Sequence, residues 1–160
     1  MKRLNVIEFT VPLTPISKKN SQQIMRNQTT GKPFIMPSKK YKEYEKAAAK
    51  YIPKNLFINE PLNIQCLFYM PTHRRCDLTN MLEAIDDIMV RVGLLADDNF
   101  NVIQSHDGSR VLYDKEHPRT KVVITFLNRI DGYNAGPIFF DEAKDSDFTA
   151  LYSSNNLAKL

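Results

Sequence analysis

The stretch between Arg74 and Asn99 constrains the fold of this chain more than any other part of the sequence. Its apolar residues recur at steps of three and four, which predicts an amphipathic helix with one face in the core. These residues are Met81, Leu82, Ile85, Ile88, Met89 and Val92. We expect Asn80 to cap this helix, Glu83 to complete a capping box, and Gly93 to end it.

Acidic residues lie at both ends of the predicted helix. Asp77 precedes it, and Asp97 and Asp98 follow it after a short loop. The two groups can converge only if that loop folds back, and convergent carboxylates would favour a hard cation with oxygen ligands. The structural alternative is that Asp77 caps the helix and that the Asp97–Asp98 pair forms a turn.

Together the two acidic groups resemble the centre of the RusA family of Holliday junction resolvases, phage and prophage endonucleases that cut four-way DNA junctions. The family pattern is D-x-D-N at a helix start, a lysine one turn later, and D-D after a loop that contains Gly. Here Asp77, Asn80 and the Asp97–Asp98 pair match that pattern. Two positions differ, since Thr79 replaces the second aspartate and Glu83 replaces the lysine.

The resemblance covers about residues 4–128 and implies an α+β fold, with two main helices packed on a mixed β-sheet. It also implies a Mg²⁺-dependent endodeoxyribonuclease that nicks branched DNA in pairs as a homodimer. Asp77 and Asp98 are the implied metal ligands and catalytic residues, and Asp97 is a weaker candidate ligand. Glu83 either replaces the missing aspartate as a catalytic ligand or only stabilises the helix start.

Two other functions remain open from the sequence. The departures at Thr79 and Glu83 favour a DNA- or junction-binding protein whose metal site no longer cuts. A nuclease that acts on flaps or nicked duplexes would use the same residues on a different substrate.

The basic residues are concentrated in the first part of the chain. Residues 1–60 contain twelve Lys and Arg against four Asp and Glu, whereas residues 61–130 contain eight against nine. This distribution suits a phosphate-binding surface beside a metal site, although scattered solvated lysines would give the same counts. The candidate DNA-binding residues are Lys18, Lys19, Arg26, Lys32, Arg74 and Arg75.

The sequence predicts one strand, a polar loop and a helix before residue 60. The strand runs from Leu4 to Val11, and the loop continues from Thr14 to Pro33. The helix runs from Lys39 to about Ile52, with Ser38 as its cap and Pro53 after it. One helix face is predicted to enter the core (Tyr41, Tyr44, Ala48, Tyr51). A second face carries Lys39, Lys42, Lys46 and Lys50, and is either solvated or a second track for phosphates.

Strands are also predicted on both sides of the central helix. Leu62–Met70 alternates as a half-buried strand does, and Lys121–Leu127 is rich in β-branched residues. Between them, the Asp107-Gly108 dipeptide predicts a hairpin that joins residues 100–107 to residues 110–113.

The length of 160 residues favours a single domain with an extension. We expect a RusA-like domain over residues 1–130 and an acidic C-terminal extension over residues 131–160. Glu8 and Pro12 interrupt the apolar start before it could serve as a signal peptide, and no stretch is long enough to span a membrane. These features predict a cytoplasmic protein.

Overall fold

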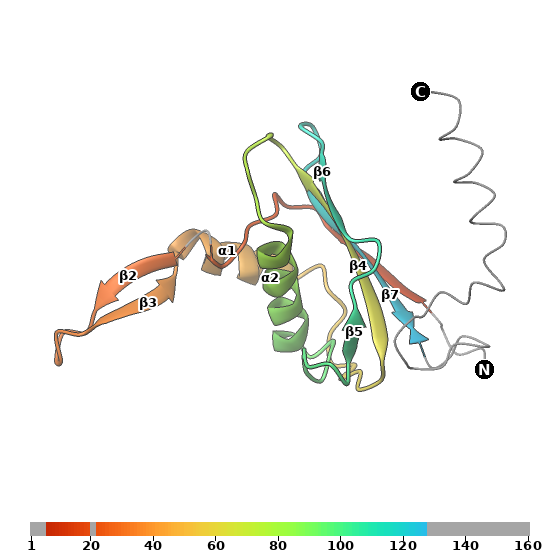
Figure 1. The fold of residues 1–160 in the computed structure, drawn as a ribbon, viewed down its shortest axis with the longest axis horizontal. Coiled ribbons are helices and arrows are strands. Elements are labelled where there is room, and N and C mark those ends of the chain that lie inside the picture. Colours follow the sequence, from red (N-terminus) through yellow and green to blue (C-terminus); the bar gives the residue numbers. More distant parts are fainter. Residues whose placement is uncertain (1–5, 20–21, 128–160) are drawn as a thin grey trace, which may run out of the picture.

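A mixed sheet with two helices on one of its faces forms the body of the protein (Figure 1). The structure is a computed structural model that describes residues 6–19 and 22–127. Within them the elements are β1 (Val6–Val11), β2 (Gln22–Arg26), β3 (Pro33–Pro37), α1 (Lys39–Ala48), β4 (Leu62–Met70), α2 (Leu78–Arg91), β5 (Ile103–Ser105), β6 (Arg110–Tyr113) and β7 (Arg119–Phe126). The predicted α+β class is confirmed.

The central strands of the sheet bury alternate side chains beneath the helices. The strand order is β1-β7-β4-β5, with β6 also paired to β4. β7 is antiparallel to both β1 and β4, whereas β5 and β6 are parallel to β4. Cross-strand neighbours in the core include Ile64 with Ile124, and Cys66 with Val122. This period-two burial explains why β4 and β7 were predictable from their sequences.

Asp77, and not Asn80, caps helix α2, so the predicted cap was wrong by one turn and the alternative in which Asp77 caps the helix is confirmed. Asp77 has an extended backbone (φ −104°, ψ 120°), and its carboxylate accepts a hydrogen bond from the Thr79 amide at 3.1 Å. Aspartate and asparagine cap equally well, so the preference for Asp77 depends on backbone conformation, which the sequence does not reveal. The buried residues of α2 are Met81, Ala84, Ile85, Asp86, Ile88 and Met89.

The predicted end of α2 at Gly93 is confirmed. Gly93 has a positive φ of 72°, and its amide donates to the Val90 carbonyl at 3.0 Å. The Leu94 amide donates to the Met89 carbonyl at 2.9 Å. These two bonds form a Schellman motif, which reverses the chain and carries Leu94 directly into the core.

The Asp107-Gly108 hairpin was a wrong prediction. β5 and β6 both run parallel to β4, along the same edge of it, so the chain does not reverse between them. Gly108 does have a positive φ of 80°, but the turn at this residue separates β5 from β6, which pair with the same edge of β4. Side chains replace the missing ladder bonds there, since the Cys66 amide donates to the Ser109 hydroxyl at 2.8 Å.

Three further features of the first 60 residues differ from the predictions. The predicted polar loop contains a hairpin, β2–β3, which projects from the body beside α1 (Figure 1). Helix α1 ends at Ala48, earlier than predicted, although Ser38 caps it as expected and accepts from the Tyr41 amide at 3.1 Å. Tyr51 lies outside the core and is 46% exposed.

The predicted extension over residues 131–160 lies outside the described residues. In the part of the chain that the structure describes, no helix is both long and apolar enough to cross a membrane.

Replacing Gly93 by Ala should lower the free energy of unfolding by about 1–2 kcal/mol, because an L-residue pays this in the left-handed region. The added Cβ would also lie 2.9 Å from the Phe57 ring. Urea denaturation measures the loss. Gly93→Asn is the matched control, since it adds the same Cβ but tolerates positive φ. A smaller loss with Asn would identify the backbone as the cause, and equal losses would identify the ring contact.

Candidate metal and nucleic-acid site along helix α2

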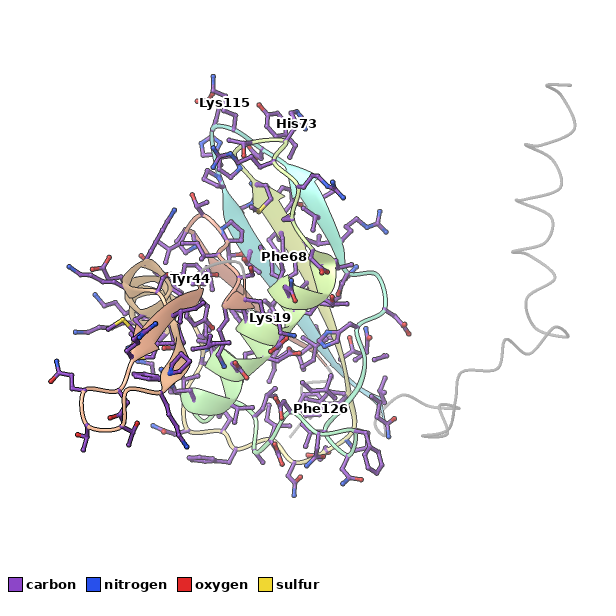
Figure 2. All side chains as sticks on the ribbon, turned by 60° about the vertical axis from the view of Figure 1, so that its left-hand side comes forward. Lys19, Tyr44, Phe68, His73, Lys115 and Phe126 are labelled. Carbon is purple, nitrogen blue, oxygen red and sulfur yellow. The ribbon has the colours of Figure 1, made fainter. Side chains whose placement is uncertain are left out.

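Two lysines from the segment after β1 pair with two acids one turn apart on the outer face of α2. Lys19 Nζ lies 2.6 Å from Glu83 Oε2, and Lys18 Nζ lies 2.8 Å from Asp87 Oδ2. Figure 2 shows Lys19 over α2. The hydrogen bond to Asp87 raises the pKa of Lys18. Both lysines were predicted to bind DNA, and the structure places them on acids beside the predicted site.

Glu83 therefore does not form the predicted capping box. Asp77, and not Asn80, is the cap, and the Glu83 carboxylate binds the Lys19 ammonium instead. A lysine from another segment therefore brings its charge to the turn of α2 that carries Glu83.

Asp77 lies exposed at the start of α2 and is held by its own turn. Its carboxylate accepts from the Thr79 hydroxyl at 2.6 Å and from the Asn80 amide group at 3.3 Å. The Thr79 hydroxyl bond is the main cause that lowers the pKa of Asp77, and the Lys19 charge adds to it. Asp77 lines a hollow of about 480 Å³ with Arg75, Cys76, Leu78 and Asn80.

The loop after α2 presents Asp98, while Asp97 is used to shape that loop. Asp97 accepts from the Asp98 amide at 2.8 Å and from the Asn99 side chain at 2.6 Å. Partial burial, contact with Asp97 and the nearby charge of Asp87 raise the pKa of Asp98. Asp98 has no ion pair among the described residues.

Asp98 lines a second and larger hollow, of about 1080 Å³, which lies between α1 and α2. Lys18 and Asp87 also line it, whereas Asp77 does not. The loop therefore brings Asp98 to the same hollow as Asp87 and the last turn of α2. Over residues 6–19 and 22–127, no group of three or more His, Cys, Asp or Glu is arranged to hold a metal ion.

A partly buried His–Asp pair joins α2 to the sheet, and the sequence analysis missed it. His106 Nε2 lies 2.9 Å from Asp86 Oδ2, and His106 Nδ1 lies 2.8 Å from the Ile64 carbonyl oxygen. A carbonyl only accepts, so Nδ1 must carry a proton. A second proton must then lie between Nε2 and the carboxylate, and the pair is neutral overall.

Few features of the sequence predict this pair. Asp86 falls among the apolar positions of α2, where its only signal is a charge at a buried position, and it is 8% exposed. His106 is a single histidine at the end of a short strand. The pair fixes α2 to β4 just downstream of the loop that carries Asp98, and the charges of Asp98 and Asp87 help to raise the pKa of Asp86.

The remaining predicted DNA-binding residues lie at two places. Arg26 and Lys32 lie on the projecting β2–β3 hairpin and its turn, and both are exposed. Arg74 and Arg75 lie exposed in the segment before α2, and neither has an ion pair among the described residues.

Aromatic contacts anchor the segment that carries Arg74 and Arg75. The His73 ring stacks on Tyr113 of β6, with 4.0 Å between centroids. Figure 2 places His73 and Lys115 at the same end of the molecule. The stack holds the start of the segment on the sheet edge while the arginines stay in solvent.

The His106–Asp86 pair predicts a stability that falls at alkaline pH. Burial alone would lower the pKa of His106, but the bond and charge of Asp86 outweigh it and raise that pKa above the ordinary 6.5. Burial also raises the pKa of Asp86, which His106 only partly opposes. Both shifts mean that the folded state holds protons more tightly than the unfolded chain, so stability must fall as pH rises above 6.5.

The measurement is the free energy of unfolding by urea between pH 6 and 9. His106→Gln removes the titrating ring and should flatten the dependence, whereas the exposed His117→Gln should leave it as in the unaltered protein. A His106→Gln protein with the original pH dependence would contradict the assignment.

Comparison with known proteins identifies the family of the chain. The family model for endodeoxyribonuclease RusA matches residues 12–125, which include both helices, Asp77 and the Asp97–Asp98 loop. A comparison with curated proteins found no match. The match confirms the predicted resemblance. The family acts on branched DNA junctions, which is the class of substrate that the resemblance implied. The match covers well over half of the chain, and the chain therefore belongs to the RusA family of endodeoxyribonucleases.

Proposed function

We propose that this protein is a Mg²⁺-dependent endonuclease that resolves four-way DNA junctions by paired nicks and works as a homodimer in the cytoplasm. The observation that carries the proposal is the environment of Asp98. Its carboxylate has no ion pair among the described residues, lies beside the charges of Asp97 and Asp87, and lines a hollow whose other wall carries lysines. A carboxylate so placed favours a divalent cation, and the lysines favour phosphate.

The donor chemistry of the site fits Mg²⁺. This ion takes oxygen ligands, keeps several waters, and is often held by only one or two carboxylates together with substrate phosphates. We propose Asp98 and Asp77 as ligands of Mg²⁺. Asp98 lines the larger hollow and Asp77 the smaller one. Asp97 is a weaker candidate, since its carboxylate shapes the loop and lines neither of these two hollows. When bound, Mg²⁺ would activate a water and offset charge on the phosphate.

The protein itself would hold the DNA backbone through exposed cations. Arg74 and Arg75 are free to bind phosphate next to Asp77, and Arg26 and Lys32 extend the cationic surface along the hairpin. We propose that Glu83 is not a metal ligand. Its ion pair positions the Lys19 ammonium over α2, beside the DNA backbone that is to be cut.

A second candidate is a junction-binding protein that does not cut. Thr79 at the second aspartate position favours it, as does the separation of Asp77 and Asp98 into different hollows. Such a protein would bind the junction with or without Mg²⁺ and leave both strands intact.

Asp77→Asn and Asp98→Asn should each abolish cutting of a labelled four-way junction in Mg²⁺, while binding of the junction persists or tightens. Asparagine also caps helices, so Asp77→Asn removes charge without removing the helix start. Gel analysis of cutting and fluorescence anisotropy in EDTA measure the two effects separately. Glu116→Gln, an exposed acid in the β6–β7 turn, is the control and should cut normally.

These outcomes separate the two candidates. An unaltered protein that binds the junction but leaves it uncut in Mg²⁺ would support the non-catalytic candidate. Either aspartate variant cutting at the unaltered rate would remove that residue from the proposed ligand set.

A charge exchange tests the role of Glu83. If Glu83 only holds Lys19, the double variant Lys19→Glu, Glu83→Lys keeps one ammonium over the same turn of α2 and should cut within several-fold of the unaltered rate. Glu83→Gln alone should cut more slowly, because Lys19 is released. Loss of cutting in the double variant as complete as in Asp98→Asn would instead identify Glu83 as a ligand.

A further inference from the structure

The lysine face of α1 is divided by the structure into two pairs with different surroundings. Lys42 and Lys46, one helical turn apart, line the large hollow between α1 and α2. Lys39 and Lys50 do not line it. From the sequence alone the four lysines form one continuous stripe, so this division appears only when α2 is in place.

The charges that line the hollow do not cancel. Lys18 is paired with Asp87, and Arg91 is paired with Glu45. Once these pairs are set aside, the remaining charged groups are two ammonium groups on α1 and the carboxylate of Asp98. Neither Lys42 nor Lys46 has an ion pair among the described residues.

We propose that this hollow holds the phosphodiester backbone of one DNA strand, with Lys42 and Lys46 on successive parts of that backbone and Asp98 beside it. The inference rests on the proposed function, and it assigns the path of the strand to α1. Residues four apart on a helix share one face, with about 5–6 Å between their Cβ atoms, so the two ammonium groups can reach separate phosphates.

The shape of the hollow fits a polymer better than a small molecule. It is partly open to solvent and has a volume of about 1080 Å³, so an extended chain could enter and leave it. Its lining combines charged side chains with the apolar side chains of Val90, Val92 and Pro37. The arrangement leaves the cationic wall on α1 and the acidic wall on α2 and its following loop, so a bound strand would pass between them.

The two lysines that the sequence favoured for DNA are less free to contribute. Lys18 and Lys19 are both held by acids of α2 at 2.8 and 2.6 Å, so phosphate must compete with a carboxylate for each of them. Lys42 and Lys46 have no such competitor. They should therefore account for a larger share of the salt dependence of binding.

The test compares two double variants of the full chain that lose the same charge. Lys42→Gln with Lys46→Gln removes the pair in the hollow. Lys40→Gln with Lys50→Gln is the matched control, since both of its lysines are exposed, lie on or next to α1, have no ion pair among the described residues, and lie outside the hollow. Circular dichroism confirms that each variant is folded.

Binding of a labelled four-way junction is measured by fluorescence anisotropy in EDTA over a range of salt concentrations. Each lost phosphate contact flattens the slope of log K against log salt by about 0.9 for duplex arms and about 0.7 for single strands. We expect the slope of the hollow variant to fall by about 1.4–1.8, and that of the control by much less. Equal slopes in the two variants, or a hollow variant that binds like the unaltered protein, would overturn the proposal.

Cutting in Mg²⁺ keeps this result separate from the proposed function. If the Lys42→Gln, Lys46→Gln variant binds and cuts like the unaltered protein, the proposed path of the strand is rejected and the proposed nuclease activity stands. If the unaltered protein binds with the expected slope but does not cut, only the nuclease activity is rejected, because the strand path is tested by binding alone.

Discussion

The burial of α2 against the central strands is the constraint on which the rest of the structure depends. One face of the helix is almost inaccessible to solvent, with Ile88 and Met89 at 0% exposure. The same helix carries three acids, at Glu83, Asp86 and Asp87. Because packing fixes the helix, these acids cannot move away from one another, so other segments supply the opposing charge. Lys18 and Lys19 do so from the segment after β1, and a histidine does so from the sheet side.

Elements whose burial follows a regular period could be predicted from the sequence, whereas elements decided by competition between segments could not. The strands β4 and β7 and the helix α2 carry their core residues at the expected spacing. The Asp107-Gly108 dipeptide does form a turn, but a turn signal does not say whether the chain reverses. The open edge of β4 takes both β5 and β6 in parallel, and that long-range pairing outweighs the local tendency to form a hairpin.

The hairpin β2–β3 was missed because its signals are spread over five residues. Asn27 accepts from the amides of Thr29 and Thr30 at 2.8 and 3.0 Å, and Gly31 has a positive φ of 68°. Neither signal resembles a two-residue hairpin turn. The candidate site shows the same division: the acids at each end of α2 are visible in the sequence, while the partners of Glu83 and Asp86 lie 64 and 20 residues away. No local pattern encodes such a pairing.

The lysine–acid pairs over α2 position charge and contribute little to the stability of the fold. The side chains of Lys19 and Glu83 are 53% and 41% exposed, and surface pairs of this kind contribute about 0–1 kcal/mol. A phosphate that approaches Lys19 therefore competes with a weak surface pair, whereas Lys42 and Lys46 have no ion pair among the described residues. The lysine–acid pairs thus fix where Lys18 and Lys19 lie over α2 and contribute little to the stability of the helix.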